Sequence, residues 1–153
     1  MDSTPIFLYA FYAPVHDNPA VQVAIMAVAI LIVLDFLFGM VGAIINKNWD
    51  SSKVRRGLAH KCGEFGFLVV ADVIDALLFA GIDLPFEIPN GCALMFVAVS
   101  LILMEISSIM ENIVKINPEL SNNKFFQLLD SVHVISLPNE ETEEAPKEDE
   151  DDA

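Results

Sequence analysis

The chain has 153 residues, of which 54% are hydrophobic, and it carries a formal net charge of -14 at pH 7. This apolar content exceeds what a single soluble domain of this length can easily bury, which argues against a soluble globular protein. Nine of the 22 acidic residues lie in residues 140–153, and the eight Lys and Arg residues form no extended basic patch, which argues against a nucleic-acid partner. We therefore expect an all-α membrane protein with an acidic tail.

The first expected region, residues 1–18, is a short segment at the outer membrane interface. Residues 6–15 are too few to cross a bilayer, and they include aromatic side chains that favour the interface. Residues 20–45 follow as an apolar run with one charged residue, Asp35. This run exceeds the ~20 residues that cross the hydrocarbon layer, so it predicts the first membrane-spanning helix.

Two further apolar segments predict two further spans. A basic loop over residues 46–61 leads to a second segment at residues 62–82, which is long enough to span but contains three acidic residues. A third segment at residues 92–114 is apolar in its first half and polar from Glu105 onward. Residues 19–114 thus form the expected three-helix transmembrane domain.

The basic residues predict the orientation, because Lys and Arg are retained on the cytoplasmic side of a membrane. With three spans, all eight fall on one side if the N-terminus is outside and the C-terminus is cytoplasmic. Five of them lie in the loop between the first two spans. We expect these five to set the topology and to contact anionic lipid: Lys47, Lys53, Arg55, Arg56 and Lys61.

After the third span, the sequence predicts a cytoplasmic amphipathic helix over residues 115–138. Asn117 and Pro118 are residue types that favour a helix start, and apolar residues recur after them at helical spacing. Such a helix could lie on the membrane or pack against a neighbouring helix. Residues 139–153 are strongly acidic and nearly free of apolar residues, so we expect them to be disordered.

Each predicted span has small and polar residues along one or two helical faces. An ionised carboxylate facing hydrocarbon at mid-membrane costs ~2.5 kcal/mol or more, so these faces should point to other helices or to water. The three segments contain no Lys or Arg that could neutralise the acids. For the small residues, plain helix packing is the better explanation, whereas for the carboxylates packing and the lining of an opening are both open. Association of helices, or lining of an opening built from several copies, is expected of Asp35, Gly39, Gly42, Ala43, Asp72, Asp75, Glu105, Ser108, Glu111 and Asn112.

Motifs for catalysis or metal binding are not found in the sequence. It has no glycine-rich phosphate loop and no catalytic triad, and its two cysteines and three histidines lack the spacing of metal ligands. We therefore expect no enzymatic activity, no cofactor and no metal.

Several sequence blocks occur in the order found in a known family: Asp35 with Gly39 and Ala43, residues 51–61, Asp75, and EISSIMEN at residues 105–112 followed by Pro118. Through these blocks, residues 34–129 resemble the bacteriophage holins of the phage-lysis and toxin-secretion group, although the acidic tail departs from the family's usual tail. The resemblance implies a small protein that oligomerises in the host cytoplasmic membrane, opens lesions at a set time and releases endolysin. In toxin-secreting relatives it implies assistance to the export of large proteins. It also implies an assembly or lining role for Asp35, Gly39, Asp75, Glu105, Ser108, Glu111 and Asn112.

Two other classes of function fit the same residues. In a small ion or solute channel, or an accessory membrane subunit, the carboxylates would form a narrow path. In a membrane scaffold, the acidic tail would recruit a cytoplasmic partner. For a holin, the expected partners are the lipid bilayer, further copies of the chain and, without direct binding, an endolysin.

Overall fold

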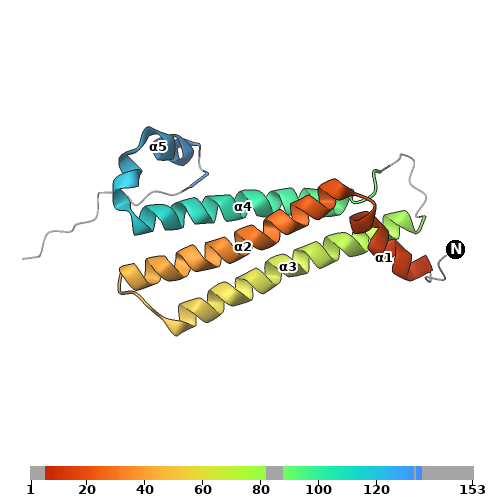
Figure 1. Cartoon of the computed structure of the whole chain (residues 1–153), viewed down its shortest axis with the longest axis horizontal. Coiled ribbons are helices and arrows are strands. Elements are labelled where there is room, and N and C mark those ends of the chain that lie inside the picture. The colour runs from red at the N-terminus through yellow and green to blue at the C-terminus, as the bar shows by residue number, and fades with distance from the viewer. Residues whose placement is uncertain (1–5, 82–87, 133, 136–153) are drawn as a thin grey trace, which may run out of the picture.

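The computed structural model describes residues 6–81, 88–132 and 134–135, and every element within these ranges is a helix. Three long helices lie side by side along the molecule (Figure 1): α2 (Pro19–Ile45), α3 (Ser51–Phe79) and α4 (Cys92–Ile116). A shorter helix precedes them and two short elements follow: α1 (Ile6–His16), the 3-10 helix η1 (Pro118–Asn122) and α5 (Lys124–Ser131). We name the two ends of the bundle after nearby residues, the Gly91 end, where α1 lies, and the Asn46 end, where α5 lies.

The helices α2 and α4 begin and end close to where the sequence predicts the first and third spans. Asn18 caps α2 by accepting hydrogen bonds from the first helical N–H groups, and Pro19 occupies the first turn. Among the described helices, α2 and α4 are the two that are long and apolar enough to cross a membrane, by length and composition. The first and third predicted spans thus coincide with two helices that are candidates for crossing a membrane.

The helix α3 begins earlier than the sequence predicts. Residues 51–61, expected as part of a loop, form about the first three turns of this helix, so the connection from α2 consists of residues 46–50 alone. The carboxylate of Asp50 starts the helix by accepting a hydrogen bond from the Ser52 N–H at 2.7 Å. This bond also lowers the pKa of Asp50 from its ordinary value. No proline interrupts the sequence from there to Phe79, so the helix continues.

The predicted amphipathic helix over residues 115–138 is also wrong in its extent. Its first two residues belong to the end of α4, which is capped by Asn117. η1 and α5 then follow as separate short elements. Asn123 starts α5 by accepting a hydrogen bond from the Phe125 N–H at 2.9 Å. No residue of α5 is buried, and the expected disordered tail, residues 139–153, lies outside the described residues.

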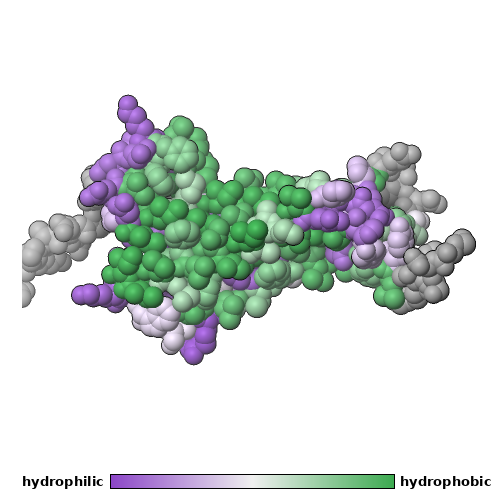
Figure 2. Space-filling view, viewed as in Figure 1, coloured by the Kyte–Doolittle hydropathy of each residue, from purple (hydrophilic) through white to green (hydrophobic). Residues whose placement is uncertain are grey.

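The core lies between the three long helices, and α2 and α4 contribute most of it. Its buried apolar residues are Val21, Ala24, Val28 and Ile32 of α2, Leu94, Ala98 and Leu101 of α4, and Leu68 and Ala71 of α3. Outside this core, large apolar side chains stay exposed, among them Val23, Phe67 and Phe96. In Figure 2 they form a hydrophobic band over the middle of the molecule, with hydrophilic residues toward its two ends. An apolar surface of this extent indicates contact with lipid or with other protein.

Candidate functional site: an ion cluster between three helices

Charged side chains from α2, α3 and α4 meet inside the bundle. The Lys61 ammonium of α3 lies 2.9 Å from Oδ2 of Asp35 on α2 and 2.6 Å from both carboxylate oxygens of Glu105 on α4. A third carboxylate, that of Glu64 on α3, lies 3.4 Å from the same ammonium. The side chains of Lys61, Asp35 and Glu105 are 12%, 10% and 2% exposed, so a single cation joins three helices in a largely buried place.

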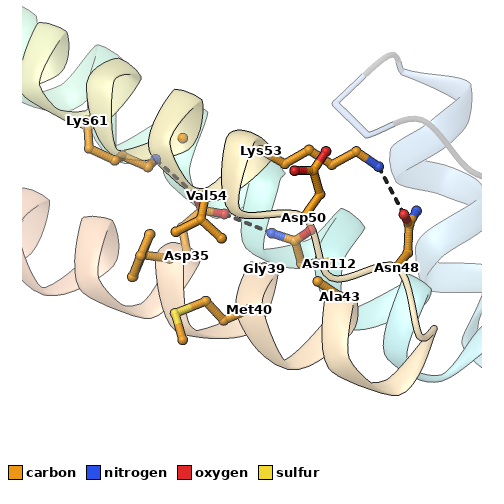
Figure 3. A pocket seen from close by; sticks show the side chains of 12 residues that line it. Asp35, Gly39, Met40, Ala43, Asn48, Asp50, Lys53, Val54, Lys61 and Asn112 are labelled. Atoms are coloured by element: carbon orange, nitrogen blue, oxygen red, sulfur yellow. Dashed lines mark hydrogen bonds and ion pairs between the residues drawn. The ribbon is translucent and has the colours of Figure 1, made fainter.

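The amide of Asn112 on α4 extends this ion cluster. Its Nδ2 donates a hydrogen bond to Oδ1 of Asp35 at 3.0 Å, while Lys61 contacts the other oxygen of that carboxylate (Figure 3). Both oxygens of Asp35 therefore have a partner, as a buried carboxylate requires. A cavity of about 250 Å³ adjoins the cluster on the side of the Asn46 end, and residues of both α2 and α3 line it.

One oxygen of the cluster has no partner. Oε1 of Glu64 contacts Lys61 and lies 2.7 Å from Nδ1 of His60, which is exposed, whereas Oε2 is buried without a hydrogen-bond partner among the described residues. Three carboxylates thus surround one ammonium, and one of them, that of Glu64, also contacts an exposed imidazole. When all three are ionised, the cluster keeps an excess of negative charge. It holds helices together without any arrangement of nucleophile and base.

The expectation that no cation neutralises the acids of the spans is wrong. Lys61 was placed in the basic loop because it lies one residue before the apolar segment, but α3 is continuous through that point. Its side chain therefore points into the bundle beside Glu64, three residues further along the same helix. Spacing within one helix could have suggested this local pair. The partners on the other two helices could not be predicted, because they depend on how the helices pack.

Asp75, expected to help helices associate, joins α3 to the start of α4. Its two carboxylate oxygens accept hydrogen bonds from the backbone N–H groups of Ala93 and Leu94, at 3.0 and 2.8 Å. The cap residue of α4 is Gly91, which has no side chain to satisfy these N–H groups. A carboxylate from a neighbouring helix thus replaces the missing cap and also complements the positive end of the helix dipole. Asp75 is 1% exposed.

The small residues of α2 face α4. An added Cβ at Gly39 would lie 3.6 Å from Nδ2 of Asn112, and one at Gly42 would lie 3.7 Å from Cγ1 of Ile116. The stripe that begins at Asp35 therefore forms the contact between α2 and α4, as close packing of small residues allows. Ala43 is half-buried and lines the cavity between α2 and α3.

The other predicted site residues lie outside the cluster. Asp72 is half-buried on α3, and its Oδ1 is buried without a hydrogen-bond partner within the described ranges. Glu111 forms an ion pair of 3.9 Å with Lys115 on the same helix. Ser108 is half-buried on α4, and no hydrogen bond in the described part of the chain connects it to Lys61 or Asp35.

The remaining basic residues of the predicted loop are exposed. Lys53 donates a hydrogen bond to Oδ1 of Asn48, and Arg55 donates one to Oγ of Ser52, both near the Asn46 end. Lys47 adopts a positive φ of 50° just after α2, where the chain turns toward α3. Arg56 is exposed on the first turns of α3. Apart from Lys61, these residues lie on the surface, where a role in topology or lipid contact remains our expectation.

Comparison with known proteins agrees with the resemblance seen in the sequence. The family described as the bacteriophage holin family matches residues 20–129, which extend from α2 to α5 and include every residue of the ion cluster. No curated protein and no solved structure matches the chain. The matched family consists of pore-forming membrane proteins rather than enzymes. A match over well over half of the chain places the protein in that family: the chain belongs to the bacteriophage holin family.

Proposed function

We propose that the chain is a holin that oligomerises in the host cytoplasmic membrane and opens lesions at a set time. Through these lesions a phage endolysin would reach the cell wall, or large proteins would leave the cell. The observation that carries this proposal is the family match over residues 20–129. The apolar surface of α2 and α4 supports it, because both helices can cross a bilayer and most of that surface is exposed in a single copy.

We also propose three membrane crossings, with the N-terminus outside and the tail in the cytoplasm. α3 has 29 residues and lies alongside α2 and α4, so it is long enough to cross with them at about 1.5 Å per residue. The described basic residues support the orientation, because they all lie toward the Asn46 end or within the ion cluster. The described part of the Gly91 end contains no Lys or Arg, as the outer side of a membrane protein favours.

A lesion wide enough for a protein requires several copies of this chain. Three long helices enclose no channel by themselves, because their shared interior is filled by the apolar core and the ion cluster. In one copy, the carboxylates of Asp35, Glu64, Asp75 and Glu105 are buried, while the surface over the middle of the molecule is apolar. We therefore propose that association of copies, followed by rearrangement, turns polar groups toward water.

The proposal is tested by inducing the chain in a bacterium that also makes a cytoplasmic endolysin without a signal sequence. Membrane potential and released endolysin are followed on one time axis. Abrupt depolarisation after a lag, together with endolysin release, is the result expected of a holin. Cultures that make only the chain or only the endolysin are the controls, and neither should release the cell contents. Depolarisation with the endolysin retained would indicate a narrow channel, and no change in either quantity would favour a scaffold.

A further inference from the structure

The attachment of α3 differs between its two ends. At the Gly91 end, α1 packs on the last turns of α3, with the rings of Tyr9 and Phe79 5.6 Å apart, and Asp75 holds the start of α4. At the Asn46 end, every residue from Ser51 to His60 is exposed except the half-buried Val54. The first ten residues of α3 therefore pack against almost nothing, and Figure 1 shows α3 diverging from α4 toward this end.

The ion cluster lies at the boundary between the attached and the unattached part of α3. Counted from the Asn46 end, Lys61 is the first residue of α3 with ion pairs to both α2 and α4 in the described part of the chain. The cavity of about 250 Å³ begins at Lys61 and Asp35 and continues between α2 and α3 toward Asn48 and Asp50. Between the cluster and the Asn46 end, this cavity thus separates α2 from α3.

The pair formed by α2 and α4 does not depend on α3 in the same way. These two helices share most of the apolar core, and the close contacts of Gly39 and Gly42 with α4 continue that interface toward the Asn46 end. The hydrogen bond from Asn46 to the backbone oxygen of Lys115 extends it to the end of both helices. α2 and α4 therefore form one packed unit, whereas α3 contributes two residues, Leu68 and Ala71, to the shared core and is joined to the unit on the Asn46 side of them by the polar atoms of the ion cluster.

From these contacts we infer that α3 is a hinged helix, fixed at the Gly91 end, and that the Lys61 ammonium is the latch that keeps its other end closed on α2 and α4. This inference rests on the proposed holin function and adds a conformational switch to it. In a single copy surrounded by lipid, the carboxylates of Asp35, Glu64 and Glu105 are stabilised by Lys61. When copies associate and water enters, water hydrates the same carboxylates, and the latch opens.

The charges of the cluster explain why such a switch has two states. Inside a medium of low dielectric constant, removing the ammonium from three carboxylates is unfavourable, so the closed form persists in lipid. In water, the same charges interact weakly, and the mutual repulsion of the carboxylates favours their separation. The environment of α3 thus decides which arrangement is stable, as expected of a two-state element.

The first test compares the time between induction and depolarisation in three variants. Lys61→Met removes the latch, and the lag should fall to less than about half of the wild-type lag, because loss of one partner strongly destabilises a buried ion pair. Lys61→Glu combined with Glu105→Lys exchanges the two charges and should return the lag close to that of the wild type. The matched control is Lys124→Met, which removes a positive charge from an exposed position on α5 and should leave the lag unchanged.

The exchange of charges keeps this test decisive if Lys61→Met fails to accumulate in the membrane. Restored accumulation and timing in the exchanged protein support the latch. An exchanged protein that behaves like Lys61→Met, or a Lys61→Met protein with the wild-type lag, would overturn it. The proposed function is judged separately, on the wild-type chain alone, and it fails if that chain does not release the endolysin.

A second test measures the movement of α3 directly with pairs of spin labels, in a background where the exposed Cys62 and Cys92 are replaced by Ser. Labels at the exposed Leu58 and Val41 report on α3 and α2 beyond the cluster, and labels at Leu77 and Val23 report near the hinge. After depolarisation, the first distance should lengthen beyond its initial distribution, and the second should stay unchanged. Equal lengthening of both, or of neither, would contradict a hinge at the Gly91 end.

Discussion

The interface between α2 and α4 and the attachment of α3 are built from different interactions. α2 and α4 meet through apolar and small residues over most of their length, from Val21 and Leu94 to Gly42 and Ile116. α3 contributes two residues to the same core and is otherwise joined to α4 and α2 by carboxylates, one ammonium and backbone N–H groups. The first interface is continuous and apolar, whereas the second combines a small apolar contact with two polar ones, the ion cluster and the Asp75 cap.

This difference has a physical consequence within a membrane. Lipid tails are as apolar as the helix surfaces, so helices associate there through close packing and hydrogen bonds rather than through the hydrophobic effect. Close packing of many atoms is lost gradually, whereas an ion cluster or a cap is lost when a single side chain is removed. The attachment of α3 should therefore respond to point substitutions much more strongly than the contact of α2 with α4.

The largest expected effect is that of Lys61→Met on the stability of the bundle. Removing one partner of a buried ion pair leaves uncompensated charge and typically costs about 3–5 kcal/mol. The free energy of unfolding in detergent micelles, measured by titration with a denaturing detergent, should fall by an amount in this range. Lys53→Met, on the exposed part of α3, should change it little. An equal fall in the free energy of unfolding for both variants would show that the loss does not come from the buried ion pairs of Lys61.

Gly91→Ala should weaken the Gly91 end by about 1–3 kcal/mol, as for other residues held in an unfavourable backbone conformation. Gly91 has a φ of 78°, and an added Cβ would lie 2.9 Å from Cγ2 of Val21 and 3.0 Å from the backbone oxygen of Pro14. The same detergent titration measures the loss. Gly63→Ala is the matched control, because Gly63 lies within α3 with no atom within 4 Å of an added Cβ. A Gly91→Ala protein with the wild-type free energy of unfolding would contradict the close packing of Gly91 against Val21 and Pro14.

Asp75→Leu should also destabilise the bundle by about 1–3 kcal/mol, since it leaves two buried N–H groups of α4 without an acceptor. It should in addition delay or prevent lesion formation, which the timing of depolarisation and crosslinking of oligomers would reveal. Asp72→Leu is the control on the same helix, because Asp72 has a buried oxygen without a partner and should cost less. Unchanged timing and normal oligomers for Asp75→Leu would contradict the expected role in lesion formation.

The smallest effect is expected for Gly39→Ala in the contact between α2 and α4. The added methyl group would lie 3.6 Å from Nδ2 of Asn112, an ordinary contact distance, and alanine favours the helix over glycine. Stability should therefore change by less than about 1 kcal/mol. Gly39→Leu needs more space at the same position and should separate α2 from α4. It should therefore lower the free energy of unfolding that the same titration measures. Tolerance of leucine would show that the interface is looser than the structure indicates.

The sequence predicted α2 and α4 well because the signals for both are local. A long apolar run and a change from apolar to polar residues each act within a few turns of one helix. The stripe of Asp35, Gly39 and Gly42 was likewise found from helical periodicity, and the structure places it against α4. The bacteriophage holin family could likewise be recognised from the sequence, because the resemblance rests on residue blocks and on their order along the chain.

The errors occurred where local signals were ambiguous. The segment from Ser51 to Lys61 is polar and was expected as a loop, yet a capping aspartate and the absence of proline allow it to continue into α3. Beyond α4, a helical spacing of apolar residues predicted one long helix, but the chain forms two short elements separated at Asn123. In both places, hydropathy alone did not specify where a helix begins or ends.

The amino-acid sequence alone is therefore enough to identify two apolar helices, their polar faces and the family. The packing of the helices determines which charges meet, because Lys61 reaches Asp35 and Glu105, and Asp75 caps α4, only in the folded bundle. The physical reason is that a helical wheel gives the direction of a side chain relative to its own helix only. Contacts between helices depend on their relative rotation, height and separation, which are set by packing over the whole bundle.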